Sequence, residues 1–194
     1  MKHVFRVLTH WGLLIHIYVS MAGFTLVLLF AITGLTLNHQ DFGFAEPELT
    51  TREMAFPEAL LESQDKAAIE EFLQRELGLG FPASDYREDE SQIQVTFAVP
   101  GRRAVVTIDR EQNSGEAELE TRGLFGKLDD LHKGFDSGPT WYWIIDISAI
   151  LLTISSLTGM ITLLSLRARR RSGFLVGAVG VVTVVVVYLV AVPH

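Results

Sequence analysis

The sequence predicts an α+β membrane protein with three transmembrane helices and one external domain between the first and second helices. Residues 11–38 contain no charged side chain, so this stretch is longer than the roughly 20 apolar residues that cross a bilayer. Two further apolar stretches lie near the C-terminus, at 141–166 and 173–192. Between the first two stretches, residues 40–139 hold 22 of the chain's 23 acidic residues, a composition typical of a soluble domain.

Positive charge predicts the orientation of the three spans. Lys2 and Arg6 precede the first span, and the run RARRR at 167–171 follows the second. Because basic flanks stay on the cytoplasmic side, we expect residues 40–139 and His194 to be external. The predicted segments are a cytoplasmic N-terminus at 1–10, a first membrane helix at 11–39, an external domain at 40–139, a second helix at 140–166, a basic cytoplasmic turn at 167–172 and a third helix at 173–192.

The second and third spans are separated by only a short basic turn, so we expect them to be antiparallel neighbours. Gly173 and Gly177 are separated by three residues, as are Ser155 and Gly159. Pairs of small residues at this spacing let helix backbones approach closely, so these positions predict helix packing.

Inside the external domain, apolar residues recur at helical spacing over residues 64–77, and Gly78 is expected to end that helix. Residues 93–99 then alternate between apolar and polar side chains, as half-buried strands do. The same alternation recurs at 104–108 and at 117–121, with turns between the three segments. We therefore predict one helix packed on a three-stranded antiparallel meander.

Composition excludes several kinds of chemistry. The chain has no cysteine, which rules out disulfides, thiolate catalysis, Cys-ligated zinc, iron–sulfur clusters and covalent haem attachment. The acidic external domain argues against nucleic acid as a partner. The motifs HExxH, GxSxG, GxGxxG and the phosphate-binding P-loop do not occur. The first apolar run is also too long for the core of a cleaved signal peptide, so we expect it to be retained.

Short motifs occur in a fixed order along the spans. They are His16, Thr33-Gly34 and Asn38-His39 in the first span, Leu131-His132 and Gly134 before the second, and Asp146, Leu157-Thr158-Gly159 and the basic end at 167–171 in the second. Together these segments resemble the PepSY-associated transmembrane family. The helix and meander between them resemble one PepSY domain, and the resemblance extends over nearly the whole chain up to Arg171.

The resemblance implies a multi-pass protein of the bacterial inner (cell) membrane, with residues 40–139 in the periplasm. Larger members of the family, with four or more spans, look like haem-containing membrane reductases, some of which act on ferric siderophores. Soluble PepSY domains are associated with binding or restraining secreted peptidases. This chain is shorter than the larger reductases, with one such domain and three spans.

His39 and His132 are the first candidate ligands. His39 ends the first span on its external side, and His132 lies nine residues before Trp141, also outside. Two neutral imidazoles from neighbouring helices are what low-spin haem b requires. With the family resemblance, this predicts that His39 and His132 bind the iron of haem b. The alternative is that both are interfacial histidines that bond headgroups, water or the external domain.

His16 is a separate candidate ligand. It lies 23 residues before His39, which is about 35 Å along a helix, so the two cannot share one haem. An ionisable side chain inside a span indicates function, but a haem at His16 would need His10 or His16 of another subunit, or a partner protein. The alternative is a histidine that packs between helices or reaches the surface. Asp146 is expected either to orient a ligand histidine or to stay hydrated near a helix N-terminus.

Two classes of function follow. The first is transmembrane electron transfer through haem b to a periplasmic acceptor such as ferric iron, which is the activity of a ferric-reductase-type oxidoreductase. The second is non-enzymatic, as a membrane-anchored PepSY module that binds or modulates a periplasmic partner or peptidase. An accessory subunit of a larger membrane complex is compatible with either. The expected partners are membrane lipid and a second copy or another membrane or periplasmic protein, and not nucleic acid.

Overall fold

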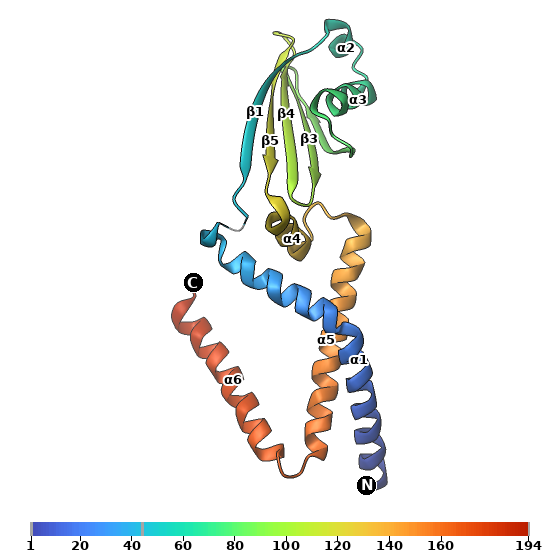
Figure 1. The fold of residues 1–194 in the computed structure, drawn as a ribbon, viewed down its shortest axis with the longest axis vertical. Helices are drawn as coiled ribbons and strands as arrows, with labels where there is room; N and C mark the ends of the chain where they lie inside the picture. The colour runs from blue at the N-terminus through green and yellow to red at the C-terminus, as the bar shows by residue number, and fades with distance from the viewer. Residues whose placement is uncertain (1, 44, 194) are drawn as a thin grey trace. The chain divides into compact units, whose positions relative to one another are not determined.

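The computed structural model describes residues 2–43 and 45–193, so the predicted position of His194 lies outside the described residues. The chain divides into two compact units. One is Leu28–Ile145, and the other combines Met1–Val27 with Asp146–His194. Figure 1 traces the elements of both units. The fold is α+β, with one antiparallel sheet and three long apolar helices, as the sequence predicts.

The unit Leu28–Ile145 contains the sheet. Its strands are β1 (Glu48–Ala55), β2 (Ala83–Glu88), β3 (Gln92–Val99), β4 (Arg102–Asp109) and β5 (Ser114–Thr121). They are ordered β1-β5-β4-β3-β2, and every neighbouring pair is antiparallel. The other elements of this unit are η1 (Gln40–Phe42), α2 (Glu58–Glu62), α3 (Lys66–Leu77) and α4 (Gly123–Lys133), with the ends of α1 and α5.

Helix α3 covers one face of the sheet, and the core lies between them (Figure 1). Ile69 and Leu73 of α3 are fully buried with Val95, Phe97 and Val106 of the sheet. The Asp65 side chain caps the helix by accepting hydrogen bonds from backbone N–H groups of its first turn. Gly78 ends the helix in the left-handed conformation. The predicted helix and its glycine stop are therefore confirmed, but the helix begins at Lys66, two residues after the predicted start at residue 64.

The predicted meander is only part of the sheet. Its three strands are present as β3, β4 and β5, but β1 and β2 extend the sheet at either edge. All but one residue of β1 and four of the six of β2 are exposed, so neither edge strand has the apolar alternation that predicts a half-buried strand. Pairing with β5 and β3 supplies the hydrogen bonds that order them.

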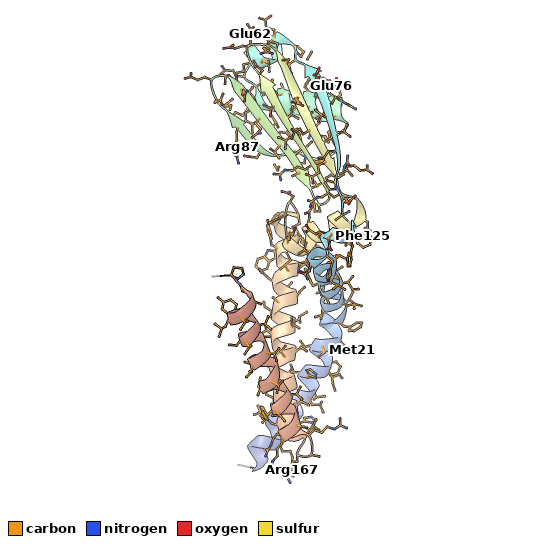
Figure 2. All side chains as sticks on the ribbon, turned by 90° about the vertical axis from the view of Figure 1, so that its left-hand side faces the viewer. Met21, Glu62, Glu76, Arg87, Phe125 and Arg167 are labelled. Carbon is orange, nitrogen blue, oxygen red and sulfur yellow. The ribbon has the colours of Figure 1, made fainter. Side chains whose placement is uncertain are left out.

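Three helices are long and apolar enough to cross a membrane: α1 (Lys2–Asn38), α5 (Gly138–Ser165) and α6 (Arg170–Ala191). Helix α1 begins before the apolar run, so most of the basic segment expected at 1–10 is helical. Side chains project along all three helices in Figure 2, where Met21, 68% exposed, is labelled. No residue of α6 is buried. Apolar helices with exposed side chains fit a multi-pass membrane protein.

Two adjacent carboxylates hold α4 in place within the unit Leu28–Ile145. Asp130 accepts hydrogen bonds from the Gly101 backbone N–H at 2.8 Å and from Arg122 Nη2 at 2.7 Å. A Cβ on Gly101 would lie 2.9 Å from Lys127 Cβ, so the β3–β4 turn meets α4 through a glycine. Asp129 accepts from Thr36 Oγ1 of α1 at 3.1 Å. Asp130 therefore ties helix α4 to the sheet, and Asp129 ties it to α1.

We predict that Asp130→Asn destabilises the sheet by about 2–3 kcal/mol, because it breaks a buried charge-assisted network. Glu120→Gln is the matched control. Glu120 pairs with the same arginine at 3.1 Å but is one-third exposed, so the expected loss is under about 1 kcal/mol. Backbone hydrogen exchange of β3–β5 in the full-length chain measures both changes. Equal losses in the two variants would contradict this role of Asp130.

Candidate functional site

His132 lies on a Thr-Gly pair of α1. Its Nδ1 is 2.7 Å from Thr33 Oγ1, and its Cε1 is 3.2 Å from the position that a Cβ on Gly34 would occupy. The Phe30 ring meets the imidazole edge to face, with centroids 5.3 Å apart. An imidazole can lie this close to the backbone of α1 only because residue 34 has no side chain.

The end of α4 holds His132 in this position. Gly134 ends the helix in the left-handed conformation, and its backbone N–H donates to the Asp130 carbonyl. Trp141 of α5 donates from Nε1 to the Leu131 carbonyl at 2.8 Å. Trp141, Leu131 and neighbouring apolar residues leave a cavity of only about 10 Å³ beside the ring. On its packed side, His132 therefore has no room for a ligand.

His16 lies on a second Thr-Gly pair, in the unit formed by Met1–Val27 and Asp146–His194. Its Nδ1 is 2.9 Å from the Ser155 carbonyl oxygen and 3.3 Å from Thr158 Oγ1. Its Cε1 is 3.1 Å from the position of a Cβ on Gly159. The hydroxyl groups of Ser20 and Ser155 form a hydrogen bond of 2.9 Å beside the ring. Ser155 and Gly159 therefore lie in a close helix contact, which is made with α1, whereas nothing lies within 4 Å of a Cβ on Gly177 of the other predicted pair.

The two histidine contacts share one local geometry. Each threonine donates its hydroxyl proton four residues back along its own helix, Thr33 to the Leu29 carbonyl at 2.8 Å and Thr158 to the Ile154 carbonyl at 2.7 Å. The threonines are 3% and 7% exposed. In each case an imidazole Nδ1 faces the threonine hydroxyl and the ring covers the following glycine.

The second ring nitrogen has no partner among the described residues in either contact. Within the described residues, Nε2 of neither His16 nor His132 forms a hydrogen bond, and both residues are only partly buried. A carbonyl oxygen can only accept, so the bond to Ser155 requires a proton on His16 Nδ1. In the neutral ring, His16 Nε2 then carries a lone pair, which can bind a metal ion or accept a proton.

The other predicted site residues lie elsewhere. His39 stacks on Phe42, with ring centroids 5.0 Å apart and planes 7° from parallel. It follows Thr33 by six residues, which on a helix is about 9 Å of rise and a different face. Among the described residues no contact joins His39 to His132, and Asp146 is exposed with no hydrogen bond or ion pair. The haem-ligand roles of His39, His132 and His16, and the supporting role of Asp146, stay predictions.

The sequence interpretation missed what the threonines do. Thr33 and Thr158 entered only as parts of family motifs, although each contacts a histidine of another helix. The signal was present as a repeat, since ITGL in α1 and LTGM in α5 place the same dipeptide within two apolar spans. A buried threonine beside a glycine in a span indicates a close polar helix contact.

The open face of the sheet is a second surface of interest. In the structure's described part, no group of three or more potential metal ligands is close enough to hold an ion. A hollow of about 660 Å³ lies over β1, β4 and β5 and includes Glu53, Asp109 and Glu116. Glu53 and Glu116 are directly opposed in neighbouring strands, which is an unfavourable pairing of like charges.

Comparison with known proteins gives one result. A family model described as "Putative PepSY_TM-like" matches residues 8–193. This match includes nearly all of α1, the whole sheet with its helices, and both α5 and α6. No curated protein and no solved structure matches the chain.

We predict that Gly159→Leu destabilises the full-length protein by about 1–3 kcal/mol, because the new side chain occupies the place of the His16 ring. The observable is a lower melting temperature in detergent. Gly177→Leu in α6 is the control, since nothing lies within 4 Å of a Cβ at that position. An equal loss in the control would show that the effect does not come from the histidine contact.

Proposed function

Because the chain belongs to the PepSY_TM-like family, we propose that this membrane protein binds haem b through histidine and passes electrons to an external acceptor such as ferric iron. One observation carries the proposal. His16 and His132 each keep Nδ1 in a hydrogen bond to oxygen and leave Nε2 without a partner among the described residues. A histidine that binds iron through one ring nitrogen commonly has its other nitrogen bonded to oxygen in this way.

The chemistry of these donors fits haem b. Imidazole is the common axial ligand of haem iron, and the absence of cysteine leaves non-covalent binding as the mode of attachment. His132 and His16 would each supply one nitrogen ligand to a haem iron. The second imidazole would come from His39 for His132, and from His10 or His16 of another subunit, or from a partner protein, for His16. The bound group would carry one electron at a time.

The chain's own residues prepare these imidazoles. Ser155 and Thr33 hold the Nδ1 side of His16 and His132, so each ring can turn only by losing a hydrogen bond. Gly34 and Gly159 let the rings lie against helix backbone. Leu29, Leu131 and Trp141 are among the mostly apolar residues that line the small cavity beside His132, and such a dry surrounding strengthens the hydrogen bond that orients this ring.

The proposed orientation places the two basic flanks of the spans, the N-terminal segment and the turn between α5 and α6, on the cytoplasmic side of a bacterial inner membrane. Arg167, Arg169, Arg170 and Arg171 surround the turn between α5 and α6, and Arg6 lies near the start of α1. Basic flanks favour the cytoplasmic side. The sheet would then lie in the periplasm, where an external electron acceptor or a periplasmic partner can reach it.

A second candidate function is supported by a different observation. The open face of the sheet presents the opposed pair Glu53 and Glu116, and the same face of β5 continues with Glu118 and Glu120. A membrane-anchored PepSY module that binds a periplasmic partner or peptidase would use such a surface without any haem. Helix α6 has no buried residue, which equally suits an accessory subunit of a membrane complex.

An absorption spectrum of the purified full-length protein tests the haem proposal. With haem supplied during expression, we expect a Soret band and sharp bands on reduction with dithionite. His132→Ala and His16→Ala should each lower the haem content. His39→Ala should lower it only if His39 supplies an axial ligand.

His194→Ala is the matched control, since it removes a histidine beyond all three spans. A colourless wild-type protein, expressed in full and supplied with haem, would overturn the haem proposal and favour the partner-binding function. Co-purification of the same periplasmic protein with wild type and with the histidine variants would support that second function.

A further inference from the structure

We propose that Thr33 is a positioning residue that fixes the tautomer of His132, holding the proton on Nδ1 so that Nε2 presents its lone pair. This inference rests on the proposed role of His132 as a ligand. At His16, two groups together fix the tautomer in the same way, the Thr158 hydroxyl and the Ser155 carbonyl. The tautomer matters because only an unprotonated ring nitrogen can bind iron.

The Thr33 hydroxyl has one proton but two hydrogen-bonding neighbours. Its Oγ1 lies 2.8 Å from the Leu29 carbonyl oxygen and 2.7 Å from His132 Nδ1. The carbonyl can only accept, so the hydroxyl proton must point to it if that contact is a hydrogen bond. The threonine oxygen then accepts, and His132 Nδ1 must donate.

The opposite arrangement is unfavourable. If the Thr33 hydroxyl donated to His132 Nδ1, the Thr33 hydroxyl oxygen and the Leu29 carbonyl oxygen would face each other at 2.8 Å with no proton between them. The proton on His132 Nε2 would also have no acceptor among the described residues. Thr33 is 3% exposed, so water cannot readily relieve the first of these defects.

His16 Nδ1 has two oxygen acceptors within 3.3 Å, whereas His132 Nδ1 has one among the described residues. The His16 Nδ1 lies 2.9 Å from the Ser155 carbonyl, which requires the Nδ1–H tautomer without any help from a hydroxyl. Thr158 Oγ1 is further away, at 3.3 Å, and its own proton goes to the Ile154 carbonyl. Loss of the Thr158 hydroxyl therefore leaves His16 with an acceptor, whereas loss of the Thr33 hydroxyl leaves His132 with none among the described residues.

The test is the ring-nitrogen NMR spectrum of ¹⁵N-histidine-labelled, haem-free, full-length protein in lipid nanodiscs, with His132 assigned by His132→Gln. In wild type, we expect His132 and His16 to carry their protons on Nδ1. Thr33→Val removes the acceptor at nearly constant volume and should shift His132 toward the Nε2–H tautomer. Thr33→Ser should restore Nδ1–H, and Thr158→Val should leave His16 unchanged.

Thr153→Val is the matched control. Thr153 is also on α5 and donates to the carbonyl four residues back at 2.8 Å, but it is exposed and contacts no histidine. It should alter neither spectrum. Where haem binds, titration with haem should give an affinity about 10-fold lower for Thr33→Val than for wild type, as for other residues that orient metal-bound histidines.

Two results would overturn this inference. One is a wild-type His132 with its proton on Nε2, which is read without Thr33→Val and so does not depend on the folding of that variant. The other is a folded Thr33→Val protein in which His132 keeps its proton on Nδ1. Failure of the haem proposal is seen separately, because the tautomer is read from haem-free protein while haem binding is read from the optical spectrum.

Discussion

The contact of an imidazole with a Thr-Gly pair is the constraint on which the rest of the helical arrangement depends. A polar ring between apolar helices needs a hydrogen-bond partner, because a buried polar atom without one is costly. Thr33 and Ser155 provide that partner for His132 and His16. The following glycine is equally necessary, since a Cβ there would press on the ring at 3.2 Å in one case and 3.1 Å in the other.

Helix α4 connects the His132 contact to the sheet within one compact unit. His132 and Asp129, three residues apart, both reach α1, while Asp130 reaches the β3–β4 turn. Residues three apart share a helix face and adjacent residues do not, which is why one short helix can hold both neighbours. The position of His132 therefore depends on the same helix that anchors the sheet.

The two candidate functions draw on different parts of the molecule and do not exclude each other. Haem binding would use the free Nε2 atoms of His16 and His132, whereas partner binding would use the acidic open face of the sheet. The directly opposed Glu53 and Glu116 reduce the stability of that face unless a cation or a basic group lies between them. In an electron-transfer protein, an acidic external surface would also attract a cationic acceptor such as ferric iron.

The sequence alone determined the three spans, the helix α3 and the central strands, because hydrophobic periodicity is a local property of the chain. It could not reveal β1 and β2, whose mostly exposed side chains have no such pattern and which depend on pairing partners far along the chain. Nor could it say which groups the histidines meet. His132 and Thr33 are 99 residues apart, and His16 and Ser155 are 139 apart. Only the docking of whole helices decides such contacts, since a side chain's partner depends on helix rotation and separation rather than on its own neighbours in sequence.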